Sequence, residues 1–172
     1  MLFRSLVYVT AGALIAHPHL NAHWTEEGLA LVDGVHVGVA VAVDDGLIAP
    51  AVLDCAELDV LTISQRLRDL AARARAGRLR VDEINEPTFT ISNLGMYEVS
   101  RFTAILNLPQ VAILATGAAE QRAIVVDGLV VPATVMAMTL SADHRAIDGV
   151  AAAQFLADRK STRLNSSHVK RT

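Results

Sequence analysis

A histidine flanked by charged residues is the feature of this chain best suited to chemistry. His144 stands between Asp143 and Arg145 in the stretch SADHRAIDG, and a second carboxylate, Asp148, follows four residues after the histidine. An apolar segment precedes the stretch and an alanine-rich one follows it, which predicts a turn between a buried strand and a helix. An imidazole at the mouth of a buried strand can act as a general base. Taken alone, the spacing favours a solvated charged turn instead.

A hydroxyl group at the end of another expected strand is the second candidate. Ser92 closes the segment 88–92, and the turn residues Asn93 and Gly95 follow it. A preorganised hydroxyl can donate a hydrogen bond to the oxyanion of a tetrahedral intermediate. The alternative is a serine that caps the turn, and without further information the residues favour that alternative.

Five segments of the chain resemble blocks of one known family. DHRAIDG (143–149) closely resembles the DHRxxDG motif of the acyltransferase (E2) component of 2-oxoacid dehydrogenase complexes. It is also similar to the HHxxxDG motif of chloramphenicol acetyltransferase, which shares that fold. The other segments follow in the family's order and are HPHLNAHW (17–24), VGVAVAVDDGLIAPAV (37–52), FTISNLGMY (89–97) and FTAILNLPQVAIL (102–114).

The resemblance implies a reaction and a role for each candidate residue. The family transfers an acyl group between the thioester of dihydrolipoamide and coenzyme A. His144 would be the general base that takes the thiol proton, because a thiol of pKa ~8.5 is mostly protonated at neutral pH and imidazole is a suitable acceptor. Ser92 matches the family's oxyanion donor. Asp148 would contact the imidazole directly or pair with an arginine, and the family's fold favours the arginine; Arg145 could belong to that network, and Asp143 would orient the turn.

The resemblance also implies partners. In the family the active site lies between subunits of a homotrimer, with the histidine and the hydroxyl on different subunits, and trimers build larger cores. We therefore expect coenzyme A as a substrate with unidentified contacts, lipoamide on a lipoyl domain outside this fragment, and E1 and E3 subunits bound through missing domains. The expected compartment is the bacterial cytoplasm, or the mitochondrion in a eukaryote.

Two alternative functions differ in kind from this one. A free-standing chloramphenicol-type O-acetyltransferase is disfavoured because the motif begins DHR rather than HH. A non-catalytic E2-like scaffold subunit is disfavoured because both His144 and Ser92 are present.

Composition limits the remaining classes of protein. The chain has 172 residues, of which 52% are hydrophobic and only 4% aromatic, so we expect one domain with an aliphatic core. A net charge of −3 gives no basic footprint for nucleic acid, and the apolar runs are too short to span a membrane. Cys55 lies among carboxylates that raise a thiol pKa, so it is a poor nucleophile. Three histidines in HPHLNAH could hold zinc, but Pro18 disrupts their spacing and we expect no metal.

Hairpin signals mixed with amphipathic helices predict an α+β fold. The resemblance specifies a chloramphenicol-acetyltransferase-like mixed-sheet sandwich with helices on one face. The expected helices are 6–16, 61–79 and 150–157, and the expected strands are 29–32, 37–43, 47–53, 88–92, 111–116, 123–126 and 130–140. Six arginines along the second helix could bind an anion, but a solvated helix face is favoured.

Both ends of the chain look foreign to this pattern. Residues 1–5 and the tail 158–172 match translations of the two strands of a common sequencing-library adapter. We therefore expect a partial E2 acyltransferase catalytic domain at 6–157, truncated at both ends. Arg4 and the apolar stretch after it imitate a signal peptide, but a core helix is favoured, as in the family.

Overall fold

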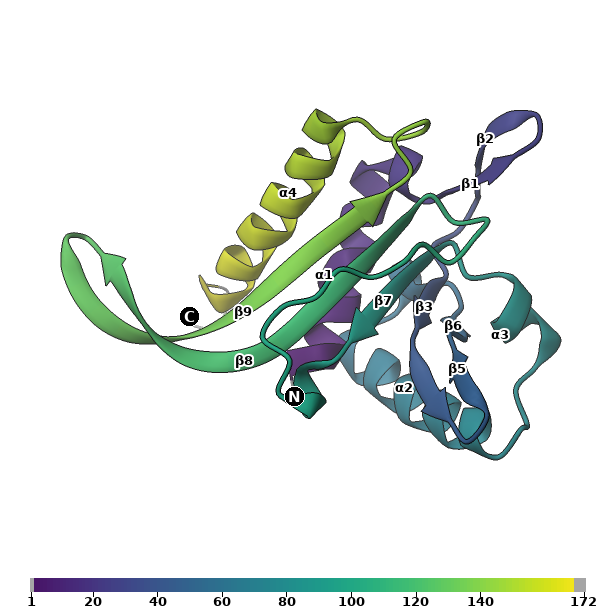
Figure 1. Cartoon of the computed structure of the whole chain (residues 1–172), viewed down its shortest axis with the longest axis horizontal. Helices are drawn as coiled ribbons and strands as arrows, with labels where there is room; N and C mark the ends of the chain where they lie inside the picture. The colour runs from purple at the N-terminus through teal and green to yellow at the C-terminus, as the bar shows by residue number, and fades with distance from the viewer. Residues whose placement is uncertain (1, 169–172) are drawn as a thin grey trace.

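A mixed sheet of five strands forms the centre of the protein, in the order β6-β3-β7-β8-β9 (Figure 1). The computed structural model describes the backbone of residues 2–168 and the side chains of residues 3–158. Strands β3 (Val37–Val39), β7 (Phe89–Asn93) and β8 (Ala112–Val126) run parallel to one another. The edge strands β6 (Ala51–Val52) and β9 (Leu129–Ala142) run antiparallel to their neighbours.

Three helices cover one face of this sheet. Helix α1 (Leu2–Ala16) lies between α2 (Val60–Arg75) and α4 (Gly149–His168) and contacts both (Figure 1). The rings of Phe89 on β7 and Phe155 on α4 pack together with 5.7 Å between their centroids, and both side chains are fully buried. The predicted α+β fold with helices on one face of a mixed sheet is therefore confirmed.

The N-terminal apolar stretch is a core helix, as predicted. Val7, Ala11 and Leu14 of α1 are completely or almost completely buried. Among residues 2–168, no helix combines the length and hydropathy that crossing a bilayer requires.

The expected helix end at residue 157 is wrong, because α4 continues as a helix to His168. Helix α1 likewise begins at Leu2, within the segment that we interpreted as foreign. A helical backbone does not decide the origin of these residues. The assignment of 1–5 and 158–172 to an adapter therefore stays a prediction.

Two expected strands are each divided in two. The segment 37–43 forms β3 and β4 (Val41–Val43), and the segment 47–53 forms β5 (Gly46–Ile48) and β6. Strands β4 and β5 pair only with each other, outside the main sheet. Pro50 lies between β5 and β6, where it has no N–H to donate to a ladder. Pro50 thus directly precedes β6, which is an edge strand of the main sheet.

Several short elements were not predicted. They are β1 (Ala22–Thr25), α3 (Val81–Asn85) and the 3-10 turns η1 (Pro18–Leu20), η2 (Cys55–Glu57) and η3 (Gly95–Tyr97). Strand β1 forms a hairpin with β2 (Gly28–Leu31), which matches the expected strand at 29–32. Elements this short carry too few residues for a period to be visible.

A long hairpin replaces the three last expected strands. Residues 111–126 were predicted as two strands, but β8 is continuous and pairs with β9 over its whole length, with an irregularity between Thr116 and Ala119. Asp127 and Gly128 form the turn, and both have positive φ, 51° and 81°. Positive φ at both central residues is the geometry that an Asp-Gly hairpin turn adopts. The end of this hairpin projects from the body of the protein (Figure 1).

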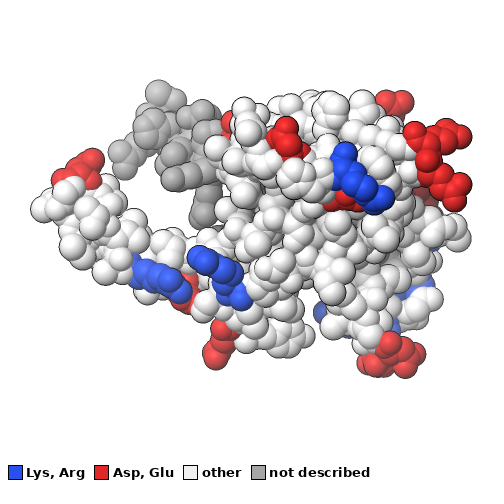
Figure 2. Space-filling model, turned by 45° about the horizontal axis from the view of Figure 1, so that its top comes forward, with Lys and Arg blue, Asp and Glu red and all other residues white. Residues whose placement is uncertain are grey.

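The arginine-rich helix is mostly a solvated face. Asp59 caps α2 by accepting a hydrogen bond from the Thr62 amide at 2.7 Å, and the helix ends at Arg75, earlier than predicted. Arg73 is partly buried and pairs with the buried carboxylate of Glu83, which the exposed Arg80 also contacts at 3.4 Å. The other five are exposed: Arg66, Arg68, Arg75, Arg78 and Arg80. On the face shown in Figure 2, basic and acidic side chains are interspersed.

Cys55 is an unreactive core residue. Its side chain is completely buried, and burial raises the pKa of the thiol to about 12, although Arg66 acts in the opposite direction. The predicted upward shift is thus confirmed, but its cause is desolvation rather than the neighbouring carboxylates.

Candidate active site

His144 occupies a turn that is fixed at both ends. The turn follows β9, and the amide of Asp143 donates to the carbonyl of Val111 at 2.8 Å. At the other end, the amide of Ile147 donates to the Asp143 carbonyl at 2.9 Å, and the Ile147 side chain is buried. The imidazole of His144 is exposed and forms no hydrogen bond within the described part of the chain. The backbone is therefore constrained while the ring is free to meet a substrate.

The two charged neighbours of His144 bind each other. The Arg145 guanidinium contacts the Asp143 carboxylate through Nε at 3.0 and 3.1 Å and through Nη2 at 2.5 Å. This contact lowers the pKa of Asp143 to about 2, so the carboxylate stays ionised throughout the neutral range. Asp143 therefore shapes the turn, as predicted, and is unsuited to proton transfer near neutral pH.

Asp148 caps helix α4. Its carboxylate accepts a hydrogen bond from the amide of Ala151 at 2.8 Å, three residues into the helix. Neither predicted partner, the imidazole or an arginine, contacts Asp148 within residues 3–158. Since α4 begins immediately after the histidine turn, the cap joins the turn to the helix that packs on the sheet.

We expect Asp148→Ala to lower the free energy of unfolding by about 1 kcal/mol, because the substitution removes the cap. Asp148→Asn keeps an acceptor at the same place and should be much closer to the wild type. Urea unfolding of the two variants measures the difference. Equal stability of the alanine variant and the wild type would show that the cap contributes nothing.

Ser92 lies near the end of β7, on the face of the sheet opposite the helices. Side chains alternate between the two faces of a strand, and Phe89 on β7 contacts helix α4. Ser92, an odd number of residues further on, therefore points away from the helices. Its side chain is half-buried, and its hydroxyl forms no hydrogen bond within residues 3–158. The turn beyond it is closed by Asn93, whose side-chain oxygen accepts from the Gly95 amide at 2.8 Å.

The register of the sheet keeps Ser92 and His144 apart within one chain. Ser92 pairs with Ala115 on β8, which pairs with Thr139 on β9, whereas β9 ends at Ala142, opposite Ala112. Two strand spacings and at least three residues along the strands separate the serine from the histidine turn. With ~4.8 Å between strands and ~3.3 Å per residue, the distance is roughly 15 Å. Ser92 and His144 therefore do not come together within one chain.

The three histidines of HPHLNAH are used separately. His17 contacts Asp158 at 2.7 Å, His23 contacts the carbonyl of Pro87 at 3.1 Å, and His19 is exposed. In the described part of the chain, no three histidine, cysteine or carboxylate side chains come together as metal ligands would.

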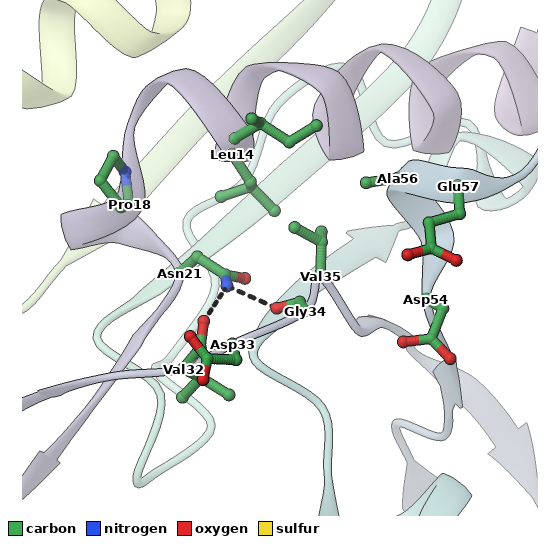
Figure 3. A pocket seen from close by; sticks show the side chains of 11 residues that line it. Leu14, Pro18, Asn21, Val32, Asp33, Gly34, Val35, Asp54, Ala56 and Glu57 are labelled. Carbon is green, nitrogen blue, oxygen red and sulfur yellow. Dashed lines mark hydrogen bonds between the residues drawn. The ribbon is translucent and has the colours of Figure 1, made fainter.

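A pocket of about 350 Å³ opens beside the end of α1, away from His144 and Ser92 (Figure 3). Its polar residue Asn21 is committed to the structure, since its amide donates to the carbonyls of Val32 and Gly34 at 3.1 and 2.8 Å. Three carboxylates line the pocket, those of Asp33, Asp54 and Glu57. This negative charge makes it unsuited to a polyanion such as coenzyme A.

Two residues that lie near the candidate residues in the structure were not singled out from the sequence. The guanidinium of Arg145 lies over the ring of Trp24, the single tryptophan, with its central carbon 4.5 Å from the ring centroid. Gly117 lies where the loop after Ser92 crosses β8, and a Cβ there would overlap the carbonyl oxygen of Ser100. Trp24 ends the block HPHLNAHW, which was the available signal, but nothing in the sequence pairs it with Arg145.

The chain belongs to the 2-oxoacid dehydrogenases acyltransferase (catalytic domain) family, whose model matches residues 1–167. A curated relative is the dihydrolipoyllysine-residue acetyltransferase component of the pyruvate dehydrogenase complex of Rickettsia prowazekii. It is 40% identical over 155 residues, which is 90% of this chain and 38% of the relative. The chain thus spans well under half of that protein.

Solved structures agree with the family assignment. The cubic core of the pyruvate dehydrogenase multienzyme complex and a dihydrolipoamide acetyltransferase of Azotobacter vinelandii each align with a TM-score of 0.87 and 33% identity. Each alignment covers 92% of this chain and 66% of the other. Chloramphenicol acetyltransferase aligns with a TM-score of 0.63 and 16% identity, over 94% of this chain and 77% of that one, which shows the shared fold.

Proposed function

We propose that this chain forms the core of an acyltransferase that moves an acyl group between the thioester of dihydrolipoamide and coenzyme A. The observation that carries the proposal is the free imidazole of His144 on a turn fixed at both ends. Acetyl is the proposed acyl group, since the Rickettsia relative is named as an acetyltransferase.

The spacing of the candidate residues along the sequence supports the roles proposed for Ser92 and His144. The Azotobacter vinelandii structure belongs to a study of the catalytic role of one serine, one histidine and one asparagine. Those residues are separated by 52 and 4 positions. The same two intervals separate Ser92 from His144 and His144 from Asp148. An asparagine oxygen can accept a cap hydrogen bond as Asp148 does, so we propose that Asp148 acts by positioning the turn.

The proposed reaction is a thiol–thioester exchange. His144 takes the proton from the coenzyme A thiol, and the thiolate sulfur bonds to the carbonyl carbon of the acyl-dihydrolipoamide. The carbonyl electron pair moves to oxygen, where the Ser92 hydroxyl donates a hydrogen bond to the resulting oxyanion. When the oxyanion collapses, the carbon–sulfur bond to dihydrolipoamide breaks. The leaving thiolate receives the proton from the His144 imidazolium, so the base returns to its starting form.

We further propose that the complete site forms between two copies of the chain in a homotrimer. A base and an oxyanion donor must both reach one thioester, within about 3 Å of the reacting atoms. The separation of roughly 15 Å within one chain favours a partner that supplies the second group. The likeness to the cubic core supports larger assemblies of such trimers. Binding of E1 and E3 through other domains, and a cytoplasmic location in a bacterium, are proposals of the same kind.

The function is tested by offering acetyl, succinyl and branched-chain acyl-dihydrolipoamides to coenzyme A. The acyl-coenzyme A product is separated by liquid chromatography and quantified, because the exchange leaves the total amount of thioester unchanged. Acetyl should be transferred fastest. Chloramphenicol as the acceptor distinguishes the O-acetyltransferase alternative. A folded oligomer that transfers no acyl group from any of the thioesters would refute the proposal.

A further inference from the structure

Arg145 is held between two side chains from distant parts of the chain. Its guanidinium binds Asp143 on one side of the turn, as described above, and stacks on Trp24 of β1, with 4.5 Å between its central carbon and the ring centroid. A guanidinium over an indole face is attracted by the ring quadrupole. Arg145 thus joins the histidine turn to the hairpin formed by β1 and β2.

Trp24 is itself fixed to the segment that carries the turn. Its amide donates to the carbonyl of Pro109 at 2.8 Å, and the amide of Val111 donates to the Ala22 carbonyl at 3.2 Å. The Val111 carbonyl in turn accepts the Asp143 amide at 2.8 Å. Backbone hydrogen bonds therefore connect β1 to residues 109–111, and those residues to the histidine turn. The contact between Trp24 and Arg145 adds a direct side-chain connection between β1 and the turn.

We propose that Trp24 is a positioning residue for His144 and acts through Arg145; this inference rests on the proposed function. The imidazole has no hydrogen-bond partner in the described chain, so the backbone on either side of it fixes its position. Arg145 follows His144 directly, and its guanidinium is held by Asp143 and Trp24 together. Loss of the indole leaves Arg145 free to move with the turn, and small misplacements of a catalytic group are costly.

Trp24 could alternatively contact a substrate, because Trp24, Thr25, Glu26 and Arg145 line an open hollow. The two roles differ in kinetics. A positioning residue affects kcat with little change in KM, whereas a lost binding contact raises KM.

Steady-state kinetics of the assembled enzyme, with coenzyme A and acetyl-dihydrolipoamide varied in turn, test the inference. Trp24→Leu should lower kcat on the order of tenfold, with both KM values within about twofold of the wild type. Trp24→Phe should recover most of the loss, because a phenyl face still attracts the guanidinium. Leu31→Ala is the matched control, since Leu31 is exposed at the other end of the same hairpin.

Arg145→Lys provides a second variant that leaves the hairpin intact. Lysine keeps a charge for Asp143 but loses the planar fork and the stacking surface, so kcat should fall as in Trp24→Leu. Wild-type kcat in Trp24→Leu or Arg145→Lys, a rise in KM alone, or no recovery in Trp24→Phe would each overturn the inference. His144→Ala in the same assay separates the two proposals, because activity retained there refutes the proposed function itself.

Discussion

Replacing His144 with alanine is expected to lower acyl transfer to coenzyme A by about 10²–10⁴-fold, the usual contribution of a general base. Without the imidazole, only the small thiolate fraction present in solution can attack the thioester. The residue is exposed and forms no hydrogen bond within the described chain, so its removal should leave the fold and the proposed trimer unchanged. Initial rates near neutral pH, together with size-exclusion chromatography, measure both effects.

His19→Ala is the control for this substitution. His19 is also an exposed histidine, but it lies on η1, directly after the C-terminal end of α1. Its loss should not change the rate. A His144→Ala enzyme that turns over at a rate close to that of the wild type would exclude the imidazole as the base. Asp143 and Asp148 are poor replacements. The contact with Arg145 lowers the pKa of Asp143 to about 2, which makes it a weak base, and Asp148 caps α4.

Replacing Ser92 with alanine is expected to lower kcat by about 10²–10³-fold, the usual effect of removing one oxyanion donor. The hydroxyl is proposed to bind the charge that develops in the transition state, so both KM values should stay close to those of the wild type. Ser92→Thr keeps the hydroxyl and should retain a large part of the activity.

Ser64→Ala on α2 removes a serine hydroxyl on the opposite, helix-covered side of the sheet and serves as the control. If Ser92→Ala instead lowered stability and left kcat unchanged, the serine would be a turn residue, as its sequence alone suggested. The absence of any hydrogen bond to its hydroxyl within residues 3–158 argues for the catalytic outcome.

Much of the fold could be predicted because its signals are local. The Asp127-Gly128 turn requires two residues that accept positive φ, and the Asp59 cap requires a side-chain acceptor three residues before an amide, so both are visible in neighbouring residues. The division of residues 37–43 into β3 and β4 was not visible. It depends on the neighbouring strand β7, whose Ile91 carbonyl accepts a hydrogen bond from the Ala40 amide at the end of β3.

The candidate residues and their division between subunits were expected from the family resemblance, whereas the chain's own local patterns predict neither. Motif resemblance proposed His144 and Ser92, and their separation within one chain follows from the strand order β7-β8-β9 and its register, which no local pattern contains. No local pattern predicts the contact of Trp24 with Arg145 either, because it depends on the hydrogen bonds between β1 and residues 109–111. For Asp148, local reasoning about helix starts would have succeeded, since an aspartate directly before a helix is a common cap.

Complementation between two inactive variants tests the central claim, a site shared by two subunits. His144→Ala and Ser92→Ala proteins are mixed in equal amounts, dissociated and reassembled, and the rate of acetyl transfer to coenzyme A is measured. If the histidine and the serine come from different subunits, random reassembly restores about one quarter of the sites, and activity recovers to about that fraction of the wild type. If each subunit supplied both residues to its own site, the mixture would stay as inactive as the two variants alone, and that result would contradict the account.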